Sequence, residues 1–184
     1  MQEKKTGPKG VIPPAERIAA SAIARLNSET PTIWLVSGPS SENRNYIANE
    51  IASYFQKSAL IDGESISNYI LTGLVLPGEE PNTESERQIE LSIRNQCILA
   101  RSFSEAGFVS VINYAILTRY HLDAYRHYLS GGKLHLAVIP SSELKFSDLN
   151  SLLVKELHGI GYWIENAKIQ SSITNLIKSE KSIL

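Results

Sequence analysis

The sequence is poor in the residues that build disulfide bonds and metal clusters. Cys97 is its single cysteine among 184 residues, which excludes an internal disulfide and any cysteine metal cluster. The four histidines show no spacing typical of metal ligands. We therefore predict no metal site. Because Cys97 sits among helix-forming residues, we interpret it as a buried structural thiol.

A long apolar run and an excess of one charge are also missing. No segment reaches the roughly 18 consecutive apolar residues that span a bilayer. The 18 basic residues nearly balance the 19 acidic ones, so no long-range field attracts nucleic acid or an anionic membrane. The polar, charged residues 1–9 lack the apolar segment of a signal peptide. We expect a cytoplasmic protein that binds neither nucleic acid nor membrane.

What the sequence does contain is an alternation of strand-like and helix-like segments. Residues 1–30 are expected to be an extension with one helix, whose apolar stripe is Ile18, Ala22, Ile23 and Leu26, and residues 31–184 to be one domain. In that domain we expect strands near 32–37, 59–62, 108–112, 134–139 and 161–164, and helices near 42–56, 83–106, 120–129, 147–157 and 171–179. Strands separated by helices predict an α/β fold with a parallel sheet. Thr83 to Glu86 has the form of a capping box at one helix start.

The turn after the first strand has the length and position of a phosphate-binding loop. Its residues are Gly38-Pro39-Ser40-Ser41-Glu42-Asn43-Arg44-Asn45, against the pattern GxxxxGK[ST]. Asn, Arg and Asn stand where Gly, Lys and Ser or Thr are required. The candidate cofactor-binding residues of this degenerate loop are Gly38, Ser40, Ser41, Asn43, Arg44 and Asn45.

Each of the three replacements weakens the phosphate chemistry in its own way. Asn43 tolerates the left-handed conformation of the missing glycine, so we expect the loop to keep its path with less room for a phosphate. Arg44 can hold an anion, but its longer, forked guanidinium does not place charge as lysine does. Asn45 lacks the hydroxyl that helps to hold Mg²⁺.

With these motifs in their order, the segment from Ile33 to Ile177 resembles the small P-loop kinases grouped with chloramphenicol phosphotransferase and zeta toxin. Besides the loop, the matching fragments are Ile61-Asp62-Gly63-Glu64, Thr72-Gly73, Leu76-Pro77-Gly78-Glu79, Glu86-Arg87 with Leu91 and Arg94-Asn95, Ala106-Gly107-Phe108, Leu134-His135-Leu136 and Gly159-Ile160-Gly161-Tyr162-Trp163. The resemblance implies a P-loop NTPase fold of the nucleotide-kinase type, a three-layer sandwich with a five-stranded parallel sheet. It also implies ATP on the first loop and a small hydroxyl-bearing acceptor above the strand ends.

Two further positions depart from what this family would carry. Asn113 stands after the third strand, where such kinases place an acidic residue near the metal, so the Walker B motif is degenerate like Walker A. No arginine follows Arg126, so the lid after the fourth strand has none to offer the phosphates. Losing one preorganised charge stabiliser costs about a hundredfold to a thousandfold in rate. Such losses together predict a pseudokinase.

Asp62 and Glu64 are the remaining catalytic candidates, because they follow a strand end. One interpretation makes them a general base or an acceptor-binding pair, and the other makes them a turn aspartate bonded to backbone and a solvated glutamate. The sequence leaves both open. Arg87, Arg94 and Arg101 share one helix face, which is either a solvated face paired to acidic neighbours or a surface for an anion or another subunit.

The first functional hypothesis is a degenerate kinase-fold protein that binds a small molecule or a protein partner and transfers no phosphoryl group, with no certain cofactor. The alternative is an ATP-dependent small-molecule phosphotransferase with an atypical P-loop, using ATP and Mg²⁺ with Arg44 and Asp62 or Glu64. A third hypothesis pairs the chain with an active paralogue, which would bury the stripe of the N-terminal helix, or with a second copy of itself. The same stripe can instead pack on the chain's own domain, which is the interpretation that we prefer.

Overall fold

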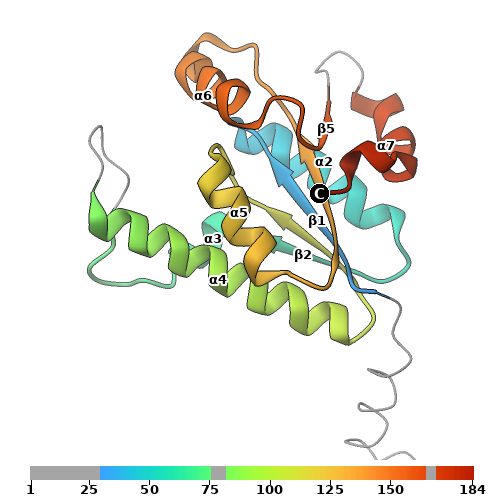
Figure 1. The fold of residues 1–184 in the computed structure, drawn as a ribbon, viewed down its shortest axis with the longest axis horizontal. Coiled ribbons are helices and arrows are strands. Elements are labelled where there is room, and N and C mark those ends of the chain that lie inside the picture. Colours follow the sequence, from blue (N-terminus) through green and yellow to red (C-terminus); the bar gives the residue numbers. More distant parts are fainter. Residues whose placement is uncertain (1–29, 76–81, 165–168) are drawn as a thin grey trace, which may run out of the picture.

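A five-stranded, all-parallel sheet forms the centre of the fold (Figure 1). The structure is a computed structural model that describes residues 30–75, 82–164 and 169–184. Its strands are β1 (Thr32–Ser37), β2 (Ser58–Asp62), β3 (Val109–Asn113), β4 (Lys133–Val138) and β5 (Tyr162–Trp163). They are ordered β2-β3-β1-β4-β5. The parallel sheet expected from the sequence is confirmed, and the N-terminal helix expected near 14–26 lies outside the described residues.

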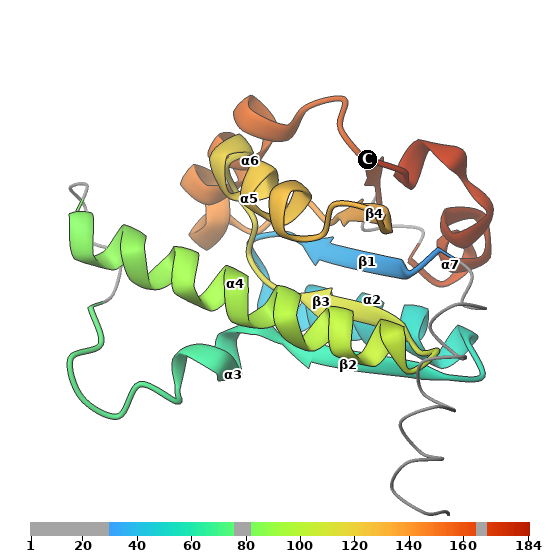
Figure 2. The ribbon, with the colours of Figure 1, turned by 60° about the horizontal axis from the view of Figure 1, so that its bottom comes forward.

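Helices cover both faces of this sheet. They are α2 (Ser41–Tyr54), α3 (Gly63–Ser67), α4 (Thr83–Glu105), α5 (Arg119–Tyr128), α6 (Ser147–Leu157) and α7 (Ile169–Lys178), with short 3₁₀ turns at 144–146 and 180–182. Side chains of α4, α5 and α6 share one apolar cluster, and those of α2 and α7 share another on the opposite face. Figure 2 shows the two helical layers on either side of the strands. The three-layer sandwich is therefore confirmed.

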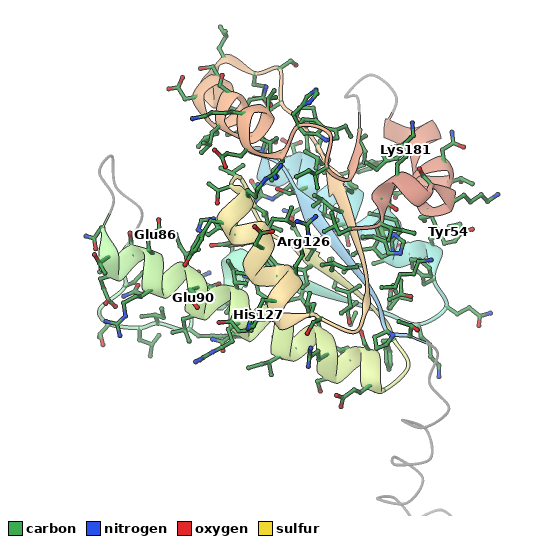
Figure 3. The ribbon with its side chains drawn as sticks, in the orientation of Figure 1. Tyr54, Glu86, Glu90, Arg126, His127 and Lys181 are labelled. Carbon is green, nitrogen blue, oxygen red and sulfur yellow. The ribbon has the colours of Figure 1, made fainter. Side chains whose placement is uncertain are left out.

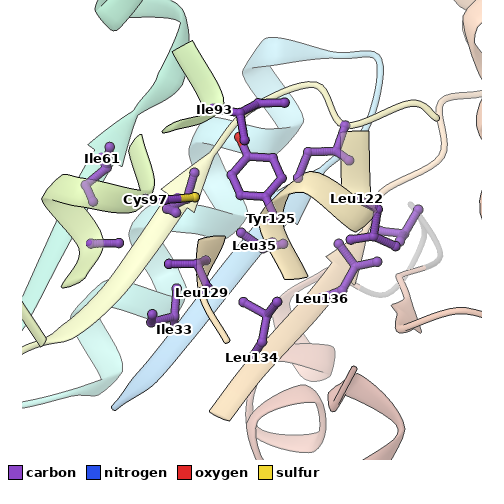
Figure 4. Packing of buried hydrophobic residues seen from close by; sticks show 14 of the residues in the cluster. Ile33, Leu35, Ile61, Ile93, Cys97, Leu122, Tyr125, Leu129, Leu134 and Leu136 are labelled. Carbon is purple, nitrogen blue, oxygen red and sulfur yellow. The ribbon is translucent and has the colours of Figure 1, made fainter. Parts of the chain in front are cut away.

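The central strand β1 supplies both cores because its side chains alternate between the faces. Ile33 and Leu35 join the cluster under α4 and α5, which Figure 4 shows from close by. Trp34 points into the cluster under α2 and α7, where its ring stacks on His135 with a centroid distance of 4.3 Å. Cys97 is buried in the first cluster, and burial raises the pKa of its thiol to about 12. The sequence-based interpretation of Cys97 as a buried structural thiol is confirmed.

Two local expectations differ from the structure. The ranges expected from the sequence include no helix directly after β2, but the short helix α3 begins there, because the Asp62 side chain accepts a hydrogen bond from the Glu64 N–H and caps it. The capping box at Thr83 does not form. Helix α4 is capped one residue earlier by Asn82, whose side chain accepts from the N–H groups of Glu84 and Ser85.

No helix in the described part of the chain has both the length and the apolar character needed to cross a membrane.

Candidate functional site

The candidate site lies where β1, β3 and β2 end, because parallel strands bring their carboxyl ends to one edge of the sheet. In the register of the sheet, Val36 and Asp62 both lie beside Asn113. The degenerate loop follows β1 directly, and α3 follows β2. The sheet therefore brings the two groups of candidate residues, the loop and the Asp62 and Glu64 pair, to the same place.

The loop itself is shorter than a phosphate-binding loop. Helix α2 begins at Ser41, and Ser40 caps it: the Ser40 hydroxyl accepts from the Asn43 N–H at 3.4 Å and its carbonyl from the Arg44 N–H at 3.1 Å. No non-glycine residue in the described ranges has a positive φ, so the expectation that Asn43 keeps a left-handed turn is wrong. With Asn43 at the position of the late glycine, helix α2 already includes residue 43. The N–H groups of Asn43 and Arg44 are therefore bonded to Ser40, the cap of the helix.

Arg44 is buried at the base of this helix, with a side chain only 2% exposed. Its Nη1 donates to the Gly38 carbonyl at 2.6 Å, its Nε donates to Asn113 Oδ1 at 3.2 Å, and its Nη2 donates to Glu64 Oε1. Burial lowers the pKa of Arg44, and the Glu64 carboxylate opposes that shift. The cation that was expected to meet an anionic ligand is thus held by three groups of the protein.

The two positions that would hold a metal ion bond to each other. Asn113 is buried, and its Nδ2 donates to the side-chain oxygen of Asn45. Both groups are neutral amides. Among the residues that the structure describes, no group of three or more His, Cys, Asp or Glu side chains is arranged to hold a metal ion.

The structure gives Asp62 and Glu64 different roles. Asp62 Oδ1 accepts from the Glu64 N–H at 3.1 Å and its Oδ2 from the Ser65 hydroxyl at 2.6 Å, as in the interpretation of a turn aspartate. Glu64 forms the ion pair with Arg44 while its side chain remains 54% exposed. It is therefore neither fully solvated nor enclosed, and it can still meet a ligand.

A cleft of about 250 Å³ opens beside α3 and includes the Glu64 carboxylate in its wall. Its lining residues are Glu64, Ser67, Asn68, Ile70, Leu74, Val75, Ser85, Gln88, Ile89 and Tyr114. Gln88 holds one wall, because its Oε1 accepts from the Val75 N–H at 2.8 Å and its Nε2 donates to the Gly73 carbonyl at 2.9 Å. Burial, and secondarily Glu64, raises the pKa of Tyr114, so its phenol stays neutral.

Sequence reasoning missed Tyr114 and Gln88. Tyr114 follows Asn113 directly at the end of β3, and this position beside a strand end was the available signal. Gly63 allows the close approach of α3, because a Cβ atom there would lie 2.7 Å from the Gln96 amide and from the Tyr114 ring. Gln88 has no local signal, since its partners lie in the preceding loop.

These residues do not fit magnesium and a nucleoside triphosphate. Asn43, at the position of the late glycine, lies in helix α2. Arg44 is already bonded to Gly38, Asn113 and Glu64. The positions of the metal ligands hold the neutral amides of Asn45 and Asn113, which bond to each other.

Comparison with solved structures identifies the architecture. A mutant APS kinase of Mycobacterium tuberculosis matches 80% of this chain and 95% of its own length, with a TM-score of 0.60 and 9% identity. The same kinase in complex with AMPPNP and APS matches 83% of this chain and 100% of its own, with a TM-score of 0.56 and 12% identity. The fold is that of a P-loop kinase. At such low identity the likeness shows the fold alone.

A gluconokinase from Sinorhizobium meliloti matches 84% of this chain and 81% of its own, at 16% identity and a TM-score of 0.47. This weaker likeness carries no argument. No protein-family model and no curated protein matches the sequence.

Proposed function

We propose that this chain is a P-loop kinase-fold pseudoenzyme, of the group that resembles chloramphenicol phosphotransferase and zeta toxin, and that it acts by binding without phosphoryl transfer. One observation carries the proposal: the Arg44 guanidinium, at the position of the catalytic lysine, is buried and bonded to Gly38, Asn113 and Glu64. The positive charge of Arg44 is therefore compensated by groups of the protein and is not available to a phosphate.

The energetics of this arrangement oppose nucleotide binding. A phosphate that recruited Arg44 would have to break its bonds to Asn113 and Glu64 and leave Asn113, which is buried, without that partner. Leaving a buried acceptor such as Asn113 Oδ1 without its donor costs about 1–3 kcal/mol, and the loss of the solvent-exposed Glu64 partner adds less. The N–H groups of Asn43 and Arg44 are also bonded within the helix start. The new contacts of a phosphate with Arg44 would first have to offset these losses.

The cleft beside α3 supports a small-molecule ligand. Ile70, Leu74 and Ile89 supply apolar walls, while Glu64 and Tyr114 supply polar groups at one end. Because Arg44 pairs with only one oxygen of Glu64 and leaves the side chain half exposed, the other carboxylate oxygen can accept a hydrogen bond. The site therefore suits an uncharged or amine-bearing molecule with an apolar body, and a carboxylate wall disfavours a phosphorylated one.

Titration calorimetry with Mg-ATP tests the loss of nucleotide binding. We expect no heat beyond dilution and no rise in melting temperature at millimolar nucleotide, with an active P-loop kinase measured in parallel. A ligand at a hundred times its Kd stabilises a protein by about 2.7 kcal/mol, so binding would be seen. A magnesium-dependent shift that Arg44→Ala abolishes would contradict the proposal and support the ATP-dependent phosphotransferase.

The ligand is sought with the same thermal assay on a panel of small hydroxylated and amine-bearing molecules, with phosphorylated analogues as counterparts. A molecule that binds in the cleft should lose its shift in Tyr114→Phe or Glu64→Gln. It should keep its shift in melting temperature in Glu50→Gln, which changes an exposed carboxylate on α2 that does not line the cleft. Hits that respond equally to all three variants bind elsewhere and count against the cleft.

A further inference from the structure

A chain of hydrogen bonds runs from the interior of the protein to the cleft beside α3. Tyr125, Gln96 and Ser92 form its buried part, the buried relay, and Tyr114 at its end lines the cleft. We propose that the buried relay orients the Tyr114 phenol as a hydrogen-bond donor into the cleft, so that the cleft selects an uncharged ligand group that is donor and acceptor at once. The inference rests on the proposed function, because it takes the cleft as the site of a small molecule.

The buried relay joins α5 to α4. Tyr125 on α5 and Gln96 and Ser92 on α4 are all buried. The Tyr125 hydroxyl donates to Gln96 Oε1, and Gln96 Nε2 donates to Ser92 Oγ at 3.0 Å. The Ser92 hydroxyl in turn bonds to the Tyr114 phenol. The Gln96 amide and the Tyr114 ring both adjoin Gly63 at the start of α3, so the relay reaches the cleft where that helix begins.

The direction of these bonds is fixed at the Tyr125 end. Tyr125 lies inside the apolar cluster (Figure 4), and burial raises its pKa well above the ordinary value, so the hydroxyl keeps its proton. A buried hydroxyl needs an acceptor for that proton, which turns the amide oxygen of Gln96 toward Tyr125 and its NH₂ group toward Ser92. Because Ser92 accepts from the NH₂ group, its own proton is left for the phenol oxygen of Tyr114.

The Tyr114 phenol therefore has its oxygen occupied by Ser92 and its proton directed away from Ser92. Tyr114 shares the wall of the cleft with Glu64. Glu64 acts on the phenol through its charge, and one of its oxygens accepts from Arg44. The cleft thus presents a donor, the Tyr114 hydroxyl, and an acceptor, the second oxygen of Glu64, to the same ligand.

This donor and acceptor together suit a hydroxyl or a carboxamide, because each of these groups can accept from Tyr114 and donate to Glu64. An ammonium offers no acceptor to Tyr114, and Arg44, already paired with Glu64, would repel a second cation. A carboxylate or a phosphate would place a like charge against Glu64. We expect each charged class to bind at least about tenfold more weakly than the uncharged class, since an unpaired donor or a like charge costs affinity.

The ionisation of Tyr114 tests the direction of the relay without any ligand. NMR of the full chain, with tyrosine labelled by ¹³C at Cζ, follows each phenol with pH, and the signal of Tyr114 is the one that Tyr114→Phe removes. A hydroxyl that donates to the phenol oxygen stabilises the phenolate, so Ser92→Ala should raise the pKa of Tyr114. Ser92→Thr keeps the hydroxyl and should keep a pKa near that of the wild type.

Ser104→Ala is the matched control for Ser92→Ala. Ser104 is another buried serine of α4, and its hydroxyl bonds to that of Ser110, about three helical turns beyond Ser92. Its loss should leave the pKa of Tyr114 unchanged. A fall of this pKa in Ser92→Ala would show that Tyr114 donates to Ser92, and an unchanged pKa would show that the two do not bond. Either result would overturn the proposal.

Four probes of similar shape test the selectivity: benzyl alcohol, benzamide, benzylamine and benzoate, titrated at pH 7 while the NMR signals of Tyr114 and Glu64 are followed. The alcohol and the amide should bind at least about tenfold more tightly than the two charged probes. Ser92→Ala should reduce the preference for the alcohol over benzylamine, because the phenol oxygen is then free to accept.

The outcomes separate this inference from the proposed function. Equal binding of all four probes would overturn the selectivity and leave the cleft as a binding site. Absence of binding by all four would count against the small-molecule cleft itself and overturn the selectivity with it, whatever the pKa of Tyr114 does.

Discussion

The guanidinium of Arg44 and the carboxylate of Glu64 form an ion pair that joins the first turn of α2 to the first turn of α3. The pair is enclosed at the arginine and open to solvent at the glutamate, with side chains 2% and 54% exposed. It closes the phosphate site on one side and shapes the cleft beside α3 on the other. One contact therefore bears on both the stability of the domain and what the domain can bind.

Removing the Arg44 side chain should destabilise the domain. In Arg44→Met the Gly38 carbonyl, Asn113 and Glu64 all lose a donor, so we expect the free energy of unfolding to fall by about 2–4 kcal/mol. Arg87→Met, which truncates an arginine whose side chain is 76% exposed, should change it by less than about 0.5 kcal/mol. Urea unfolding measures both. Equal stability of the two variants would show that the buried arginine is not structurally important.

Restoring the missing carboxylate should not restore nucleotide binding. In Asn113→Asp one oxygen can still accept from Arg44, while the other faces Asn45, whose amide must turn to donate. We expect stability within about 1 kcal/mol of the wild type and still no calorimetric response to Mg-ATP, because Arg44 keeps its place. Magnesium-dependent binding by Asn113→Asp would instead show that the wild type fails to bind nucleotide because it lacks the carboxylate, and not because Arg44 is enclosed.

Acid should destabilise the protein through His135. Burial, and secondarily Lys133, lowers the pKa of this histidine to about 4, against about 6.5 in the unfolded chain. Below pH 6.5 the unfolded state binds a proton that the folded state rejects, so stability is lost as pH falls from about 6.5 to 4, by about 3 kcal/mol in total. Urea unfolding at pH 7 and pH 4.5 should show a smaller loss in His135→Gln than in the wild type.

The matched control for this prediction is His127→Gln, which replaces an exposed histidine on α5 (Figure 3). It should keep the pH dependence of the wild type. A His135→Gln variant with that same dependence would show that His135 does not take up a proton on unfolding.

Cys97 should react with thiol reagents only when the domain opens. Because burial raises the pKa of its thiol to about 12, little thiolate exists at pH 8. We expect labelling of the folded protein to be at least about a hundredfold slower than labelling in urea. A cysteine introduced by Ser151→Cys, at an exposed position on α6, should react at once. Rapid labelling of wild-type Cys97 would contradict its burial.

Much of the fold followed from local patterns, and the exceptions share a cause. Helix α6 has the bounds that were expected, and all five strands lie within two residues of their predicted starts. Helix α3 was missed because its start depends on the Asp62 cap and on the close approach of Gly63 to Gln96 and Tyr114. The cap of α4 was misplaced by one residue because Asn82 and Thr83 are both capping residue types, and only the geometry decides between them.

For the site, the sequence by itself determined which chemical groups are present. Hydrophobic periodicity predicted the strand ends, and the residue types Asn, Arg and Asn in the loop already indicated that the usual groups for magnesium and phosphate are missing. Only the tertiary structure decided what Arg44 does. Its acceptors come from the end of β1, the end of β3 and the start of α3, and no local pattern encodes a meeting of three separate segments. Parallel pairing of the strands brings those acceptors together, and burial then makes it costly for the guanidinium to leave them.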